Sequence, residues 1–182
     1  TIFGPPGTGK TTALIKLVQE KLLDGVRPQD IGFMSFSRKA ATEAKERASR
    51  ILDLNPKDMV YFRTLHSLAF SWLGLSTSEV MSGRDYNELG KLVGLDFRTT
   101  QTINMEEGAL FNIGAGGDKY MSLIQYARVK QVDLQEEFHK GWDQSLNWQQ
   151  LNVLDKAFKD YKRRKGKYDF IDMIEKFIFR GT

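Results

Sequence analysis

Eight residues close to the start of the chain limit its possible folds more than any other segment. They read Gly4-Pro5-Pro6-Gly7-Thr8-Gly9-Lys10-Thr11 and fit the pattern G-x-x-x-x-G-K-[ST]. The glycines allow backbone conformations that point successive N–H groups inward, where they bind anionic oxygens together with the N-terminus of the following helix. Apolar residues 1–3 precede the loop and a helical pattern follows it, so the sequence predicts a phosphate-binding loop between a strand and a helix.

The residue types in this Walker A loop assign roles to individual side chains. Lys10 is expected to place its ammonium group against the β- and γ-phosphates, and the hydroxyl of Thr11 is the expected ligand of Mg²⁺. We therefore predict ATP and Mg²⁺ as cofactors and Lys10 and Thr11 as catalytic residues. The predicted phosphate-binding set is Gly4, Pro5, Gly7, Thr8, Gly9, Lys10, Thr11 and Thr12. The alternative is a glycine-rich turn that binds nothing, and the agreement of pattern, strand and helix disfavours it.

Strand and helix patterns alternate along residues 1–75. Short apolar runs at 31–36 and 59–62 predict strands, and segments 11–23, 39–52 and 65–73 predict helices. This order is typical of a parallel sheet with crossover helices. The predicted apolar helix faces are Leu14, Leu17, Val18 and Leu22 in the first helix, and Ala40, Ala44, Ala48 and Ile51 in the second.

The strand patterns end near Gly74. Residues 76–147 contain helical patches around 86–93 and 120–131, and we expect a mostly helical insertion there. An amphipathic helix is predicted at 148–164, followed by a helix at 170–179 for which Asp169 is a candidate N-cap. The basic run 162–165 falls at the end of the first of these helices, where we expect a solvated surface that suits the helix dipole.

The charge is unevenly distributed along the chain. Basic residues outnumber acidic ones by 11 to 7 in residues 1–75 and by 9 to 5 in 148–182, while acidic residues lead by 11 to 7 in 76–147. Basic flanks indicate a polyanionic partner, although chance variation of a solvated surface is the alternative. The chain has no cysteine, and no apolar stretch approaches the length of a membrane span. These features predict a cytoplasmic protein of a bacterial or phage-infected cell that has no membrane partner.

Two further segments separate the protein classes that share this loop. Residues 33–41, Phe-Met-Ser-Phe-Ser-Arg-Lys-Ala-Ala, resemble motif Ia of UvrD/Rep-type superfamily 1 DNA helicases, and residues 62–70, Phe-Arg-Thr-Leu-His-Ser-Leu-Ala-Phe, resemble their motif Ib. The segment Tyr168-Asp169-Phe170-Ile171-Asp172-Met173 is similar to the D-F segment before their motif II. The resemblance covers residues 1–75 and 148–182 and is weak between them.

This resemblance implies a RecA-like P-loop NTPase fold. It assigns 1–75 and 148–182 to an incomplete ATP-binding motor domain and 76–147 to a helical subdomain inserted in it. It also implies contacts with single-stranded DNA, or with a junction of single and double strands, through Phe36, Ser37, Arg38, Thr64 and His66. Aromatic and small polar groups suit binding without base readout. The structural alternatives are a core role for Phe36, a helix brace for His66 and a solvated helix start for Arg38, which replaces the family's usual asparagine.

The carboxylates needed for ATP hydrolysis are missing from the sequence. The family's motif II supplies an Asp for Mg²⁺ and a neighbouring Glu, yet the dipeptide Asp-Glu does not occur in this chain. We therefore expect the N-terminal fragment of an ATP-dependent DNA helicase, with a second motor domain in the parent protein and little hydrolysis by the fragment alone. The alternatives are an AAA+ or other P-loop ATPase, a small-molecule kinase, or a non-enzymatic ATP-binding module.

Overall fold

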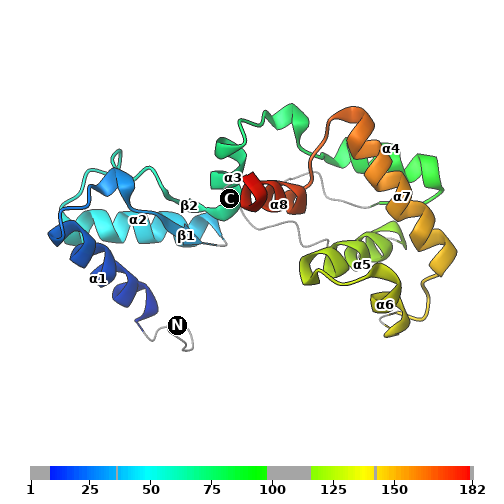
Figure 1. Cartoon of the computed structure of the whole chain (residues 1–182), viewed down its shortest axis with the longest axis horizontal. Helices are drawn as coiled ribbons and strands as arrows, with labels where there is room; N and C mark the ends of the chain where they lie inside the picture. Colours follow the sequence, from blue (N-terminus) through cyan, green and yellow to red (C-terminus); the bar gives the residue numbers. More distant parts are fainter. Residues whose placement is uncertain (1–8, 36, 98–115, 142, 181–182) are drawn as a thin grey trace. The chain divides into compact units, whose positions relative to one another are not determined.

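The computed structural model describes residues 9–35, 37–97, 116–141 and 143–180 (Figure 1). The chain forms two compact units, Thr1–Leu68 and Ala69–Thr182. The predicted strand at 1–3, most of the glycine-rich loop and Phe36 lie outside the described residues.

The first unit contains a parallel β-α-β arrangement. Helix α1 (Lys10–Leu23) and a 3-10 turn η1 (Pro28–Asp30) lead to strand β1 (Phe33–Ser35), helix α2 (Arg38–Leu52) and strand β2 (Phe62–Thr64). The two strands pair in parallel, and α2 makes the crossover between them. The mixed α/β fold and the parallel strands are confirmed for this unit, but β2 begins three residues later than predicted because Met59 precedes the strand as a buried residue.

The predicted apolar faces of the first two helices are partly wrong. Helix α1 buries Ile15 and Val18, while Leu14 and Leu17 are 41% and 48% exposed. Four apolar residues fall within positions 14–18, so periodicity alone fits either stripe and the packing against α2 decides between them. Helix α2 buries Ala44 and Ala48 as predicted, but it buries Ala41 in place of the predicted Ala40 and Ile51. Its small buried side chains let the helix lie close to the sheet.

The second unit is helical. Helix α3 (Leu65–Trp72) enters it, and η2 (Thr77–Glu79), α4 (Gly83–Val93), α5 (Gly116–Lys130), α6 (Leu134–His139), α7 (Trp148–Lys165) and α8 (Phe170–Arg180) follow. Helix α7 packs on α4 and α5, and a core that includes Leu89, Ile124, Leu154 and Phe158 fills the space between them. Helix α7 therefore packs with the segment that sequence analysis treated as an insertion, and the assignment of 148–182 to the motor domain stays a prediction.

Helix α8 packs on a second, smaller core of the same unit. Its residues Phe170 and Met173 lie against Ala69 of α3 and Val80. An isolated parallel bridge between Val80 and Tyr168 joins the segment before α4 to the segment before α8, through hydrogen bonds of 2.8 and 2.9 Å. Helix α8 is thus fixed to α3 on its apolar side.

Candidate functional site

At the N-terminus of α1, the backbone conformation favours glycine, which is the residue that the phosphate-binding pattern has at this position. Gly9 adopts a left-handed conformation with φ of 79° and is the N-cap residue, and its carbonyl accepts the N–H of Ala13 at 2.9 Å. A Cβ at this position would meet no atom within 4 Å, so glycine is selected by the positive φ and not by crowding. The position therefore needs glycine for its backbone conformation.

The electrostatics of this helix end suit an anion. Lys10 and Thr11 are the first two residues of α1, followed by Thr12, and the first turn contains no acidic side chain. Uncompensated backbone N–H groups carry partial positive charge at a helix N-terminus, and the Lys10 ammonium adds to it. The predicted residues Gly4, Pro5, Gly7 and Thr8 lie outside the described part of the chain.

The predicted DNA-binding residues follow the carboxyl ends of the two strands. The register pairs Ser35 with Thr64, which are the last residues of β1 and β2. Ser37 and Arg38 lie two and three residues after the end of β1, and His66 lies two residues after the end of β2, as the second residue of α3. The pairing therefore brings these side chains to one edge of the sheet, which is where open α/β sheets bind their ligands.

Two of these residues also cap helices at this edge, and a third is partly buried. The Ser37 hydroxyl caps α2 by accepting the N–H of Ala40 at 3.2 Å. Thr64 is buried, and its hydroxyl accepts the N–H of Ser67 at 3.1 Å in the first turn of α3. His66 is half-buried, and burial lowers the pKa of its imidazole. A neutral imidazole is therefore expected at neutral pH, able to donate one hydrogen bond without adding charge.

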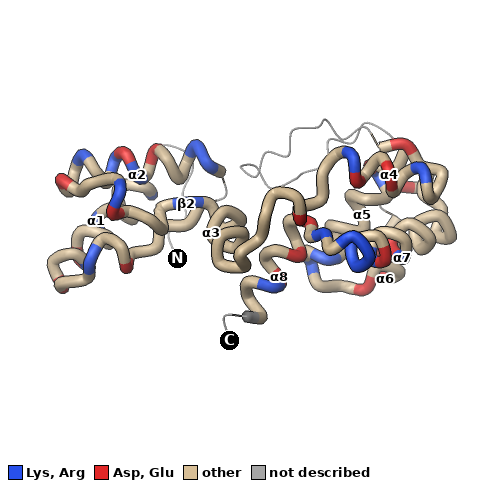
Figure 2. The backbone as a smooth tube through the Cα atoms, turned by 90° about the horizontal axis from the view of Figure 1, so that it is seen from above, with Lys and Arg blue, Asp and Glu red and all other residues tan. Residues whose placement is uncertain are grey.

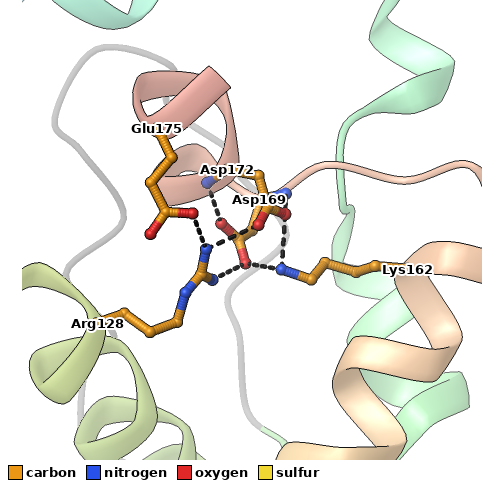
Figure 3. Close-up of polar contacts among 5 residues, drawn as sticks. All are labelled: Arg128, Lys162, Asp169, Asp172 and Glu175. Carbon is orange, nitrogen blue, oxygen red and sulfur yellow. Dashed lines mark hydrogen bonds and ion pairs between the residues drawn. The ribbon is translucent and has the colours of Figure 1, made fainter. Parts of the chain in front are cut away.

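Sequence analysis missed a cluster of buried charges in the second unit (Figure 3). This α8 ion cluster consists of Arg128 on α5, Lys162 on α7, Asp169 at the start of α8, and Asp172 and Glu175 on α8. The guanidinium of Arg128 donates to all three carboxylates at 2.7 to 2.8 Å. The ammonium of Lys162 lies 2.5 Å from Asp169 and 2.6 Å from Asp172. Two cations therefore face three carboxylates.

The cluster keeps its buried carboxylate ionised. Burial alone raises the pKa of Asp169, but the nearby charges of Lys162 and Arg128 outweigh burial, and the pKa ends below its usual value. The Asp169 carboxylate also accepts the N–H of Asp172 at 2.8 Å, so the predicted N-cap of α8 is confirmed. The prediction that the whole run 162–165 is solvated is wrong for Lys162, because its ammonium is held by these two carboxylates inside the unit.

A cavity of about 560 Å³ lies beside the α8 ion cluster. Figure 2 shows basic residues gathered at the C-terminal end of α7, and Lys162 and Arg163 from this segment line the cavity. Its lining has six basic side chains, but several pair with carboxylates, such as Lys159 with Asp155 and Lys167 with Asp85. The charges there are largely compensated. Among the described residues, no group of His, Asp or Glu side chains is arranged to hold a metal ion, and no helix is long and apolar enough to cross a membrane.

Comparison with known protein families identifies the family to which the chain belongs. The family described as "UvrD/REP helicase N-terminal domain" matches residues 1–179. The chain belongs to the UvrD/REP helicase N-terminal domain family. The match extends over both units, so the helical unit and α8 are part of the UvrD/REP helicase N-terminal domain as much as the β-α-β unit is.

A curated relative carries the family's activity in its name. The chain is 24% identical over 180 residues to a protein of Mycoplasma pneumoniae (strain ATCC 29342 / M129 / Subtype 1) described as "Probable DNA helicase". The alignment covers 95% of this chain but 32% of the relative. The chain therefore spans about a third of the length of this relative.

Proposed function

We propose that this chain is the N-terminal part of an ATP-dependent DNA helicase, in which it binds ATP–Mg²⁺ and single-stranded DNA. The observation that carries the proposal is the edge of the β1–β2 pair, where Ser37, Arg38, Thr64 and His66 follow neighbouring parallel strands. The family match over residues 1–179 supports it and favours a helicase over the AAA+ and kinase alternatives.

ATP would bind at the N-terminus of α1. The N–H groups of the loop from Gly4 to Gly9 and of the first turn would hold the phosphates, with Lys10 neutralising their charge. The hydroxyl of Thr11 would complete the coordination of Mg²⁺, which withdraws charge from the phosphate oxygens when bound. The two parallel strands and the crossover helix are compatible with a RecA-like sheet, of which they would form one part.

DNA would lie along the edge formed by Ser37, Arg38, Thr64 and His66, with Phe36 as a further contact. Arg38 supplies a cation at the start of α2, and the neutral His66 supplies a hydrogen-bond donor. Such groups hold phosphates and sugars and do not read bases. The parent protein would supply the second motor domain and the motif II carboxylates, since this chain contains no Asp-Glu pair.

ATP binding is tested with a fluorescent ATP analogue and Mg²⁺. Lys10→Ala should reduce the affinity by tenfold or more, because a charge-assisted contact with phosphate contributes about 1.5–3 kcal/mol. Lys16→Ala is the matched control, since Lys16 is an exposed lysine on the same helix. Equal affinities of the two variants would refute the phosphate site. Steady-state hydrolysis by the pure chain that Lys10→Ala abolishes would refute the expected lack of hydrolysis.

DNA binding is tested with labelled oligothymidylate over a range of salt concentrations. Arg38→Ala should weaken binding and reduce the slope of log affinity against log salt by about 0.7, the value for one phosphate contact on a single strand. Arg50→Ala removes the same charge from the last turn of the same helix, and should leave the slope unchanged. Identical slopes for the two variants would mean that the edge does not contact DNA. A chain that binds ATP but no DNA would be the non-enzymatic nucleotide-binding module.

A further inference from the structure

Helix α8 presents two chemically different faces. Its apolar face, which includes Phe170, Met173 and Phe177, packs against the part of α3 that lies in the same unit. Trp72 of α3 makes an edge contact with the ring of Phe177 at 6.1 Å between centroids. The carboxylates that α8 contributes at positions 172 and 175, together with its cap Asp169, face α5 and α7 instead (Figure 3).

The acidic face is held by charges from two other helices. Arg128 reaches carboxylates at positions 169, 172 and 175, which follow each other along almost two turns of α8. A planar guanidinium that bonds to three carboxylates spaced along almost two turns restrains both the position and the rotation of the helix. Lys162 adds a second fixed point from α7 at the N-terminal end of α8.

We propose that α8 is a coupling element, in which the α8 ion cluster on one face fixes how the opposite face packs against α3. Helix α3 begins at Leu65, directly after Thr64, and its second residue is His66. The helix whose first turn supplies the proposed DNA contact is therefore the one that α8 supports. Arg128 contacts the carboxylates of α8 and its cap, and through α8 it acts as a positioning residue for α3.

The cluster is suited to this role because it already contains more carboxylates than cations. Two cations face three carboxylates, so the loss of Arg128 leaves one ammonium for three anions within one small region. The repulsion between the carboxylates would then act on α8 and not on α5 or α7, because Asp172 and Glu175 belong to α8 and Asp169 is its N-cap. Helix α8 is thus expected to shift or open before α5 and α7 do.

Hydrogen exchange of the 182-residue chain, followed by mass spectrometry, tests the coupling without any ligand. In Arg128→Met, amides of α8 and of residues 69–73 in α3 should exchange about tenfold faster or more, because both would open in one local unit. Helix α6 packs on α5 as well, and its exchange should not change. Lys119→Met is the control, since it removes a cation from the other end of α5 and breaks its contacts with Asp143 and Ser145, which lie outside the α8 ion cluster.

Two results would overturn the coupling. Faster exchange in α8 without a change in α3 would show that the two faces are independent. An equal rise throughout the unit, α6 included, would show a loss of overall stability and no specific coupling. If Arg128→Met does not fold, Arg128→Lys decides the matter, because an ammonium group keeps the charge but cannot span all three carboxylates as the guanidinium does, and it should give the same pattern at smaller size.

The functional consequence rests on the proposed function and has its own readout. Arg128→Met should weaken binding of oligothymidylate about twofold to thirtyfold, the usual range for coupling through packed elements, while Lys119→Met should not. If the unchanged chain binds no oligothymidylate, the proposed DNA function fails, and the exchange pattern alone then supports or overturns the coupling. If the chain binds DNA and Arg128→Met changes α3 exchange but not DNA affinity, the link from α3 to the DNA edge is refuted.

Discussion

Replacing Lys162 with methionine measures how strongly the α8 ion cluster depends on its charge balance. Lys162 is 9% exposed at its side chain and contacts Asp169 and Asp172 at 2.5 and 2.6 Å, and its ammonium lies 4.2 Å from the centre of the Phe158 ring. Methionine preserves the length and the apolar stem of the side chain, so the main loss is the ammonium group. The variant leaves Arg128 as the single cation facing three carboxylates.

The expected cost follows from burial. Removing one partner of a buried ion pair destabilises a protein by about 3–5 kcal/mol, because the remaining charge stays buried without compensation. Arg128 continues to contact both aspartates, so we expect a loss close to 3 kcal/mol at the lower end of that range. In Lys159→Met, three residues earlier on α7, the deleted ammonium lies 2.6 Å from Asp155 but is 65% exposed. An exposed pair of this kind contributes about 0.5 kcal/mol or less.

Urea unfolding followed by tryptophan fluorescence separates these values. All three tryptophans, Trp72, Trp142 and Trp148, belong to the second unit, so their emission reports that unit and not the β-α-β unit. A difference of about 2.5 kcal/mol between the two variants should move the unfolding midpoint by about 2 M urea at a slope near 1.2 kcal/mol/M. If the midpoints of Lys162→Met and Lys159→Met agree within about 0.5 M, burial of the cluster is not what makes Lys162 important.

Three further perturbations test other parts of the fold. The pKa of Asp169 is lower in the folded state than its unfolded value near 3.8, so its ionised carboxylate stabilises the fold above that pH. This stability is lost as the pH falls below that value towards the folded-state pKa. Asp169→Asn should therefore flatten the acid limb of a plot of unfolding free energy against pH. Gly90→Ala should cost about 1–3 kcal/mol in urea unfolding, since its Cβ would lie 2.3 Å from a backbone oxygen, whereas Gly166→Ala meets open space and should cost about 1 kcal/mol from its positive φ alone. Thr64→Val should lower the free energy of unfolding by about 1 kcal/mol, because the N–H of Ser67 loses its acceptor, and Thr64→Ser should retain the cap. Unfolding followed by circular dichroism measures the difference.

The elements of the first unit could largely be predicted from the sequence because their signals are local. The glycine at position 9 marks a left-handed N-cap, and the alternation of short apolar runs with helical segments predicts the crossover between β1 and β2. The side of α1 that packs inward could not be predicted in the same way. Leu14 and Ile15 are equally apolar neighbours, and the partner surface that selects Ile15 includes Ala48, Met59 and Phe62, which are more than thirty positions away.

The α8 ion cluster could be predicted only in part, because its carboxylates are close together in the sequence and its cations are distant from them. Asp169 and Asp172 are close in sequence and predict a helix cap, which the structure confirms with the N–H of Asp172 at 2.8 Å from Asp169. Their cations come from elsewhere, and Arg128 is separated from Asp169 by 41 residues. A capping carboxylate at the surface would need no cation, because water solvates its charge. The side chain of Asp169 is 1% exposed and therefore needs compensating positive charge. The burial of a capping carboxylate is therefore the feature that requires both cations, and burial becomes known only when the helices that cover Asp169 are placed.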